Sequence, residues 1–247
     1  MKKTIAIILC LLLALCSFAA CGGNDKKETL IVYLEAGFPP FEYPDGDKVV
    51  GVDVDIANAI GEKLGMNVVI KDVPFDSICA GIAEDNACGI SGITITEERK
   101  ENVDFTSPYF TSKQAIIYKE GALTPVNGVI STDVLIGKKV GVQTGTTGDF
   151  LVQDVCGEDA PKQYSNALVA TQDIGSGCDY VVIDNIVAKN IVANNAGLSF
   201  ANLDAEEEPI GIAVKKGNTE LLNKLETALQ ELIADRKIDE FMVKHSK

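Results

Sequence analysis

Short apolar segments alternate with segments of helical spacing along almost the whole chain, in two successive series. In the first series, strands are predicted at 30–34, 68–70 and 89–95, and helices at 53–64 and 77–83. Asp53 suits the N-cap of the first helix, and Gly65 suits its C-cap. Strands and helices that alternate in this way build parallel sheets with helices on both faces, because a crossover between parallel strands needs a helix. The pattern therefore predicts an α/β fold.

A second series follows the first. Its predicted strands are 114–118, 139–143, 163–164, 180–183 and 210–214, and its predicted helices start near 149, span 167–174, end near 194 and span 219–234. Because the two series have a similar order, we expect two lobes. A ligand would bind in the cleft where the strand ends of both lobes meet.

The first 20 residues have the composition of an export signal. Two lysines precede an apolar run at 5–15, and small residues follow it. A membrane-spanning helix needs roughly 20 apolar residues, so this run is too short to span. We predict that residues 1–20 are a signal peptide and that the polar, glycine-led residues 21–28 are a tether.

The end of this signal resembles the bacterial lipobox, with the sequence Phe18-Ala19-Ala20-Cys21. The departure is Phe18, because an aliphatic residue usually stands there. The resemblance implies that Cys21 becomes an acylated N-terminus. The mature chain would then be held at the extracytoplasmic face of the bacterial cytoplasmic membrane.

The charge balance restricts the class of partner. The chain has 36 acidic against 22 basic residues, a formal net charge of −14. Nucleic-acid binding requires basic patches over phosphates, so it is not expected. An acidic surface mildly favours cationic solutes.

Four cysteines lie beyond the signal and the lipobox: Cys79, Cys88, Cys156 and Cys178. In an exported chain, Cys79–Cys88 and Cys156–Cys178 are the locally plausible disulfides, but small buried thiols are an equal alternative. No Cys-x-x-Cys motif or Cys/His cluster is present, so no metal site or cofactor is expected.

Six motifs together resemble the extracellular solute-binding proteins of family 3, the amino-acid-binding components of ABC importers. They are FPPFE at 38–42, GVDVDI at 51–56, GITITEER at 92–99, GTTG at 145–148, DYVVID at 179–184 and IGIAV at 210–214. The departure is Val52, where a larger apolar residue is usual. The resemblance implies a type II periplasmic-binding-protein-like fold of two α/β lobes joined by two crossover strands, with the ligand cleft between them.

The GITITEER motif carries the predicted carboxylate site. Arg99 offers a planar fork of donors that can grip a carboxylate, although Thr96 and Arg99 could also form only a helix-capping turn. The resemblance implies that Arg99 binds the ligand's α-carboxylate. It also implies contributions from a second set of residues, namely Ser91, Gly92, Thr94, Thr146 and Thr147.

The other end of a zwitterion would be bound by Asp184, which could alternatively cap the helix that follows it. The resemblance favours an α-ammonium role for Asp184. Glu35 and Gln143 would contact the ligand side chain, between apolar walls at Phe38 and Val52. An acid and an amide favour arginine, lysine, ornithine or glutamine, while a solvated Glu35 is the alternative.

The resemblance also predicts the domain organisation and the partners. Lobe 1 would comprise 29–109 and 211–247, and lobe 2 would comprise 114–205, with hinges at 110–113 and 206–210. A monomer would deliver its amino acid to an ABC permease served by a separate ATPase. Two alternatives are a carboxylate-dependent dehydratase of the prephenate or arogenate type and a sensory ectodomain. His245 is the only histidine, so a histidine-based nucleophile pair is not expected at the site.

Overall fold

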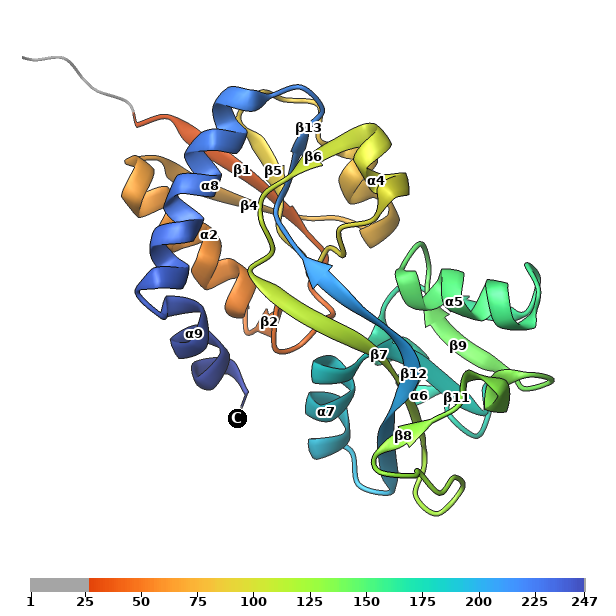
Figure 1. Cartoon of the computed structure of the whole chain (residues 1–247). Coiled ribbons are helices and arrows are strands. Elements are labelled where there is room, and N and C mark those ends of the chain that lie inside the picture. Colours follow the sequence, from red (N-terminus) through yellow and green to blue (C-terminus); the bar gives the residue numbers. More distant parts are fainter. Residues whose placement is uncertain (1–26, 247) are drawn as a thin grey trace, which may run out of the picture.

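The computed structural model describes residues 27–246, which form two α/β lobes joined by two long strands (Figure 1). The predicted signal peptide and Cys21 lie outside the described residues. In lobe 1, five strands are hydrogen-bonded in the order β4-β1-β5-β13-β6. Their bounds are Thr29–Leu34 (β1), Asn67–Asp72 (β4), Ala87–Gly89 (β5), Val103–Phe105 (β6) and Ala213–Lys215 (β13).

Helices lie around this sheet, and the two longest bury an apolar stripe in its core. The helices are α2 (Val52–Leu64), α3 (Ile78–Gly81), α4 (Glu97–Asn102), α8 (Thr219–Ala234) and α9 (Lys237–His245), with a short 3-10 turn at Phe75–Ser77 and a hairpin of β2 (Tyr43–Asp45) and β3 (Lys48–Val50). The buried core joins strand residues such as Leu30 and Val32 to Ile56, Ile60 and Leu225. Burying such side chains supplies most of the driving force for folding.

Lobe 2 has a six-stranded sheet in the order β10-β9-β11-β7-β12-β8. Its strands are β7 (Phe110–Lys119), β8 (Val129–Ile130), β9 (Val140–Gln143), β10 (Pro161–Tyr164), β11 (Tyr180–Asp184) and β12 (Leu198–Ile210), and its helices are α5 (Thr147–Cys156), α6 (Ala167–Gln172) and α7 (Asn185–Ala193), with a 3-10 turn at Thr132–Leu135. The strands β9, β10 and β11 run parallel, so their carboxyl ends meet at one edge, facing lobe 1 (Figure 1).

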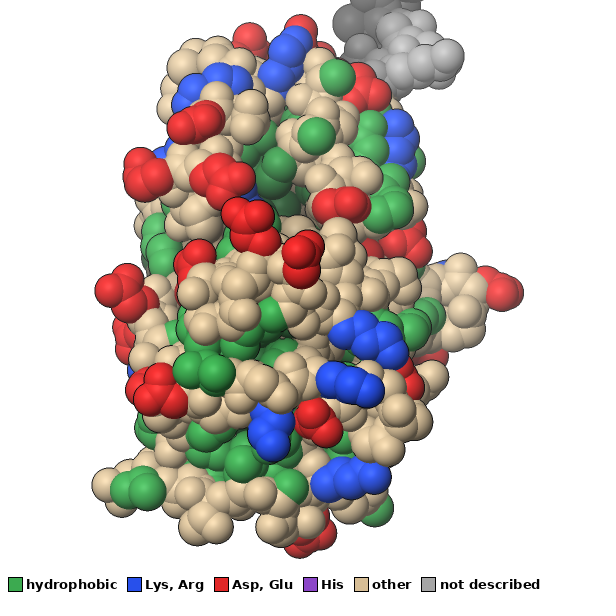
Figure 2. Space-filling view, turned by 90° about the vertical axis from the view of Figure 1, so that its right-hand side faces the viewer, with side chains coloured by type: hydrophobic (Ala, Val, Ile, Leu, Met, Phe, Trp, Pro, Cys, Tyr) green, Lys and Arg blue, Asp and Glu red, His purple; other side chains and the backbone are tan. Residues whose placement is uncertain are grey.

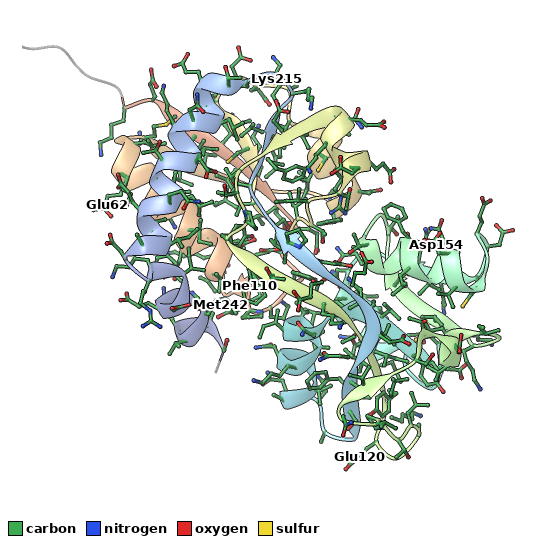
Figure 3. All side chains as sticks on the ribbon, viewed as in Figure 1. Glu62, Phe110, Glu120, Asp154, Lys215 and Met242 are labelled. Atoms are coloured by element: carbon green, nitrogen blue, oxygen red, sulfur yellow. The ribbon has the colours of Figure 1, made fainter. Side chains whose placement is uncertain are left out.

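Two antiparallel strands carry the chain between the lobes. Strand β7 pairs with β12 from Phe110 opposite Ile210 to Lys119 opposite Leu198, with an irregularity between Asn202 and Glu207. Phe110 lies at the middle of the molecule, between the two lobes, as Figure 3 shows. The end of β12 therefore lies between the two lobes.

Two of the predicted strands are wrong in extent. The strand predicted at 89–95 ends at Gly89, because Gly92 takes a left-handed conformation (φ 55°) and turns the chain. Beyond that turn, Thr94 makes only an isolated bridge to Ile210. The strand predicted at 210–214 is divided between β12 and β13, and helix α9 was not predicted.

The ends of α2 separate one wrong prediction from one that is confirmed. Gly51, not Asp53, is the N-cap, and Asp53 lies inside the helix with its carboxylate fully buried. Gly65 is the C-cap in the left-handed conformation, as predicted.

The four cysteines of the described chain are all free thiols, so neither local disulfide forms. Within residues 27–246, no helix is both long and apolar enough to cross a membrane. The same residues contain no cluster of three or more His, Cys, Asp or Glu side chains that could hold a metal ion.

Candidate functional site

A narrow cavity lies between the two lobes and brings together ten of the eleven ligand-binding residues predicted from the sequence. It is lined by Glu35, Phe38, Glu42, Phe75, Ser91, Gly92, Thr94, Arg99, Gln143, Thr146, Thr147 and Asp184. The exception is Val52, which does not line it. The Val52 side chain is fully buried in the core of lobe 1, so the expectation that it forms a cavity wall is wrong.

Arg99 reaches across the cleft from lobe 1. It stands in the first turn of α4, where its amide donates to the capping hydroxyl of Thr96 (3.1 Å). Its guanidinium donates to the carbonyl of Thr94 (Nη1, 2.9 Å) and to that of Gly145 in lobe 2 (Nη2, 3.1 Å). The same group lies over the ring of Phe75, 5.3 Å from its centre. The capping turn and the binding role are thus compatible, because the turn fixes the backbone while the fork points into the cavity.

Ser91 and Gly92 line the cavity, and hydrogen bonds to other residues of lobe 1 hold them in place. Ser91 Oγ donates to Glu42 Oε1 (2.8 Å) and accepts from the amide of Glu35 (3.0 Å). The Gly92 amide donates to Asp53 Oδ2 (2.7 Å). A Cβ at Gly92 would lie 2.6 Å from the ring of Phe38, so only glycine fits this turn.

Two of the groups that accept these hydrogen bonds are the buried carboxyls of Glu42 and Asp53. Burial, and the charge of nearby Asp53, raise the pKa of Glu42 well above its usual range. Burial likewise raises the pKa of Asp53 to about 6, although the Gly92 amide and the Tyr109 hydroxyl donate to it and oppose the rise. Glu42 is therefore the protonated member of the pair at neutral pH. One of its oxygens, Oε2, has no hydrogen-bond partner within residues 27–246.

Lobe 2 supplies the N-terminus of α5. Thr146 is its N-cap, accepting from the Asp149 amide (3.2 Å) and donating to the carbonyl of Gln143 (2.9 Å). The amides of Thr147 and Gly148 precede the first intrahelical hydrogen bond, so they have no acceptor within the helix. A helix start of this kind attracts an anion.

Asp184 ends β11 and stands at the N-terminus of α7. Its side chain makes no capping hydrogen bond, and its Oδ1 is buried without a partner in the described part of the chain. Burial raises the pKa of Asp184 to about 7, the neighbouring charge of Glu208 adds to the rise, and Arg99 opposes it. Oδ1 is thus a buried acceptor that lacks a donor, and an ammonium group would supply one.

At the opposite end of the cavity, Gln143 Nε2 donates to Glu35 Oε2 (3.0 Å), which joins lobe 2 to lobe 1. Burial, with a smaller contribution from the charge of Asp72, raises the pKa of Glu35 to about 7. Beyond Glu35 a second hollow continues outward, and Asp72 and Asp76 are among its lining residues. The face that carries α4 and α5 has acidic side chains across its middle, around a hollow (Figure 2). These charges all favour a cationic or amide side chain over an acidic one.

Comparisons with known proteins agree with this architecture. Residues 30–247 match the family model described as bacterial extracellular solute-binding proteins, family 3. The chain belongs to this family.

Family 3 relatives resemble the chain over nearly its whole length. A probable histidine-binding protein of Neisseria gonorrhoeae is 35% identical, covering 99% of this chain and 96% of the relative. The arginine-binding extracellular protein ArtP of Bacillus subtilis is 32% identical, with 94% and 93% covered. An ancestral arginine-binding protein in complex with arginine is 42% identical, with a TM-score of 0.80 and 89% and 98% covered. The same protein is also known in complex with glutamine, with a TM-score of 0.81.

Two residues that line this family 3 cavity were missed from the sequence, Glu42 and Phe75. Glu208, which does not line it but accepts from Thr94 and Thr147, was also missed. Glu42 belongs to the FPPFE motif, and its position next to a buried phenylalanine was a usable signal that it is buried too. Phe75 lies in a short 3-10 turn, where no periodic pattern marks it. Glu208 lies in a run of three acids that reads as a solvated face.

Proposed function

We propose that this chain captures a polar α-amino acid outside the cytoplasm and delivers it to an ABC permease, with arginine, lysine, ornithine or glutamine favoured. The observation that carries the proposal is the placement of Arg99 and Asp184 in one cavity, with Glu35 at its other end. A cation and an anion that line one cavity match the two charges of a zwitterion. Relatives that are arginine- and histidine-binding proteins by name, rather than enzymes, support this assignment.

The test is a thermal-shift screen of the mature protein against the twenty amino acids, ornithine and cystine. A ligand that binds only the folded state at 100 times its Kd stabilises it by about 2.7 kcal/mol, so the unfolding midpoint rises measurably. We expect the largest shifts with arginine, lysine, ornithine or glutamine. A protein that no amino acid stabilises would refute the proposal.

Delivery requires the lobes to open and close. We propose that 110–113 and 206–210 are the hinges, between lobe 1 at 29–109 and 211–247 and lobe 2 at 114–205. Two contacts between the lobes support a closing motion: Arg99 with Gly145, and Gln143 with Glu35. The radius of gyration from X-ray scattering should fall when ligand is added, and an unchanged value would contradict the closing motion.

The finer localisation is a lipid anchor at Cys21, which the lipobox resemblance supports. Intact-mass measurement of the cell-associated protein should show acyl chains on a chain that begins at Cys21. Cys21→Ser should abolish both the acylation and the cleavage. An unmodified mature protein in the wild type would refute the anchor without affecting the amino-acid site.

A further inference from the structure

The carboxylate of Glu208 joins the two halves of the site. Glu208 lies near the end of the crossover strand β12, and its Oε2 accepts from Thr147 Oγ1 (2.8 Å) of lobe 2 and from Thr94 Oγ1 (3.1 Å) of lobe 1. Gln114 Nε2 of β7 donates to both of its oxygens (3.1 and 3.2 Å). Glu208 lies outside the two motifs that contain these threonines. Its carboxylate accepts the hydrogen bonds of two hydroxyls that the sequence analysis assigned to the ligand.

These contacts determine what the threonines can offer a ligand. Each hydroxyl has one proton, and both protons are donated to Glu208, so Thr94 and Thr147 keep only acceptor lone pairs. The ligand's carboxylate must then be held by Arg99 and by the free amides at the start of α5. The expectation that threonine hydroxyls donate to it does not fit this arrangement.

The region around Glu208 also has more acceptors than donors. Two buried acceptors, Asp184 Oδ1 and Gln114 Oε1, have no hydrogen-bond partner within residues 27–246. A buried acceptor without a donor is costly, and two carboxyls in one place repel each other. An ammonium group corrects both defects, because it brings three N–H donors and a positive charge.

We propose that Glu208 is a specificity-determining residue of the amino-acid site. Together with Asp184 it forms a two-carboxylate subsite for the α-ammonium group, and it holds the Thr94 hydroxyl as an acceptor for that group. The inference rests on the proposed function. It adds a residue of the crossover strand to the ligand site, so ammonium recognition and lobe closure share one side chain.

The neighbouring residues provide a matched control. Glu206 and Glu207 are exposed, whereas Glu208 is half-buried. Glu207→Gln removes the same charge one residue away, where the side chain points out of the site. A general effect of acidity would appear in both variants, and a specific one only in Glu208→Gln.

The experiment compares arginine with 5-guanidinopentanoate, which lacks only the α-amino group, by titration calorimetry. We expect Glu208→Gln to lower the affinity for arginine by about ten- to hundredfold, since hydrogen bonds to charged groups contribute about 1.5–3 kcal/mol. Its effect on 5-guanidinopentanoate should stay below about threefold, and Glu207→Gln should change neither. Glu208→Asp keeps the charge on a shorter side chain and should give an intermediate loss for arginine alone.

The pH profile gives a readout that a purely structural role would not change. Asp184 must ionise to bind an ammonium, so the affinity for arginine relative to 5-guanidinopentanoate should fall below about pH 7. Glu208 and Arg99 act on Asp184 directly, while Glu35 and Glu42 line the same cavity. Both ligands carry the guanidinium, so the response of Glu35 cancels in the ratio. In Glu208→Gln the fall should move to lower pH, because a neighbouring negative charge is gone.

Two results would overturn the inference while leaving the proposed function intact. One is an equal loss for both ligands in Glu208→Gln, and the other is an equal loss for arginine in Glu207→Gln. If Glu208→Gln does not fold, Glu208→Asp decides, and an equal loss for both ligands in that variant overturns the inference. A folded wild type that binds no amino acid would instead refute the proposed function.

Discussion

The two ends of the cavity differ in how their charges are arranged. One end has charges of both signs close to one another, because the guanidinium of Arg99 lies near the carboxyl groups of Asp184 and Glu208. The other end holds one acid, Glu35, bonded to the amide of Gln143, and it continues into an acidic hollow. The first end fits groups that every α-amino acid has, and the second fits groups that only some have. Binding strength and ligand choice should therefore depend on different residues.

The largest effect should come from Arg99→Met, for every amino-acid ligand. A carboxylate enclosed between two lobes loses its water, and removing its buried partner costs roughly 3–5 kcal/mol, or about two to three orders of magnitude in Kd. Arg99→Lys should recover only part of this, because a point charge lacks the two-pronged geometry. Calorimetry of all three proteins checks this, and a folded Arg99→Met that binds within threefold of wild type would contradict it.

Asp184→Asn should weaken the binding of every α-amino acid by about ten- to hundredfold. It should nevertheless raise the unfolding free energy of the ligand-free protein. Folding raises the pKa of Asp184 to about 7, so the folded state holds the proton more tightly than the unfolded state, and the wild type loses stability as the pH rises from about 4 to about 7. The gain should be about 1–3 kcal/mol at pH 8 and should vanish near pH 3, below the unfolded-state pKa of about 3.9. Urea unfolding without ligand at both pH values measures it, and an equal effect at the two would contradict the account.

Glu35→Gln tests the other end. It should lower the affinity for arginine and lysine by about tenfold, because only a cationic side chain is attracted by the charge of Glu35. The affinity for a small neutral amino acid should stay within threefold of wild type. Asp76→Asn is the control, since Asp76 is exposed in the same outer hollow and water screens its charge. Equal losses for charged and neutral ligands would mean that Glu35 supports the fold of the site and does not read the side chain.

The smallest effect should come from Glu42→Gln. Although Glu42 lines the cavity, its raised pKa keeps it neutral, so an amide of the same shape replaces it with little change in charge. We expect less than a threefold change in affinity and less than about 1 kcal/mol in stability at pH 7. A loss as large as that of Asp184→Asn would show that Glu42 acts as a charge.

The sequence predicted those parts of the site in which chemistry and local structure coincide. Arg99 follows a capping threonine by three residues, and Asp184 ends an apolar strand. Each of these patterns also fits a helix cap, and the resemblance of the motifs to family 3 favoured ligand binding. Glu208 could not be found in this way. Its partners Thr147 and Thr94 are 61 and 114 residues away, and only the antiparallel pairing of β12 with β7 places it between them.

The errors in the fold have the same origin. The alternation of apolar and hydroxyl residues at 92–96 is typical of a strand, but the buried Asp53 holds the Gly92 amide and turns the chain into a loop. Asp53 itself looked like a helix cap because acids are common there, while tertiary burial decided its role. Local sequence patterns show the periodicity of a segment, but they do not show which distant group a buried side chain contacts.

The central claim, that one cavity binds both charges of a zwitterion, is tested most directly by changing the ligand and not the protein. Calorimetry of the wild type would compare arginine with agmatine, which lacks the carboxylate, and with 5-guanidinopentanoate, which lacks the ammonium. Each loss leaves a buried charge of the site without its partner, so both analogues should bind at least about a hundredfold more weakly than arginine. Arginine binding accompanied by either analogue within threefold of it would contradict the account.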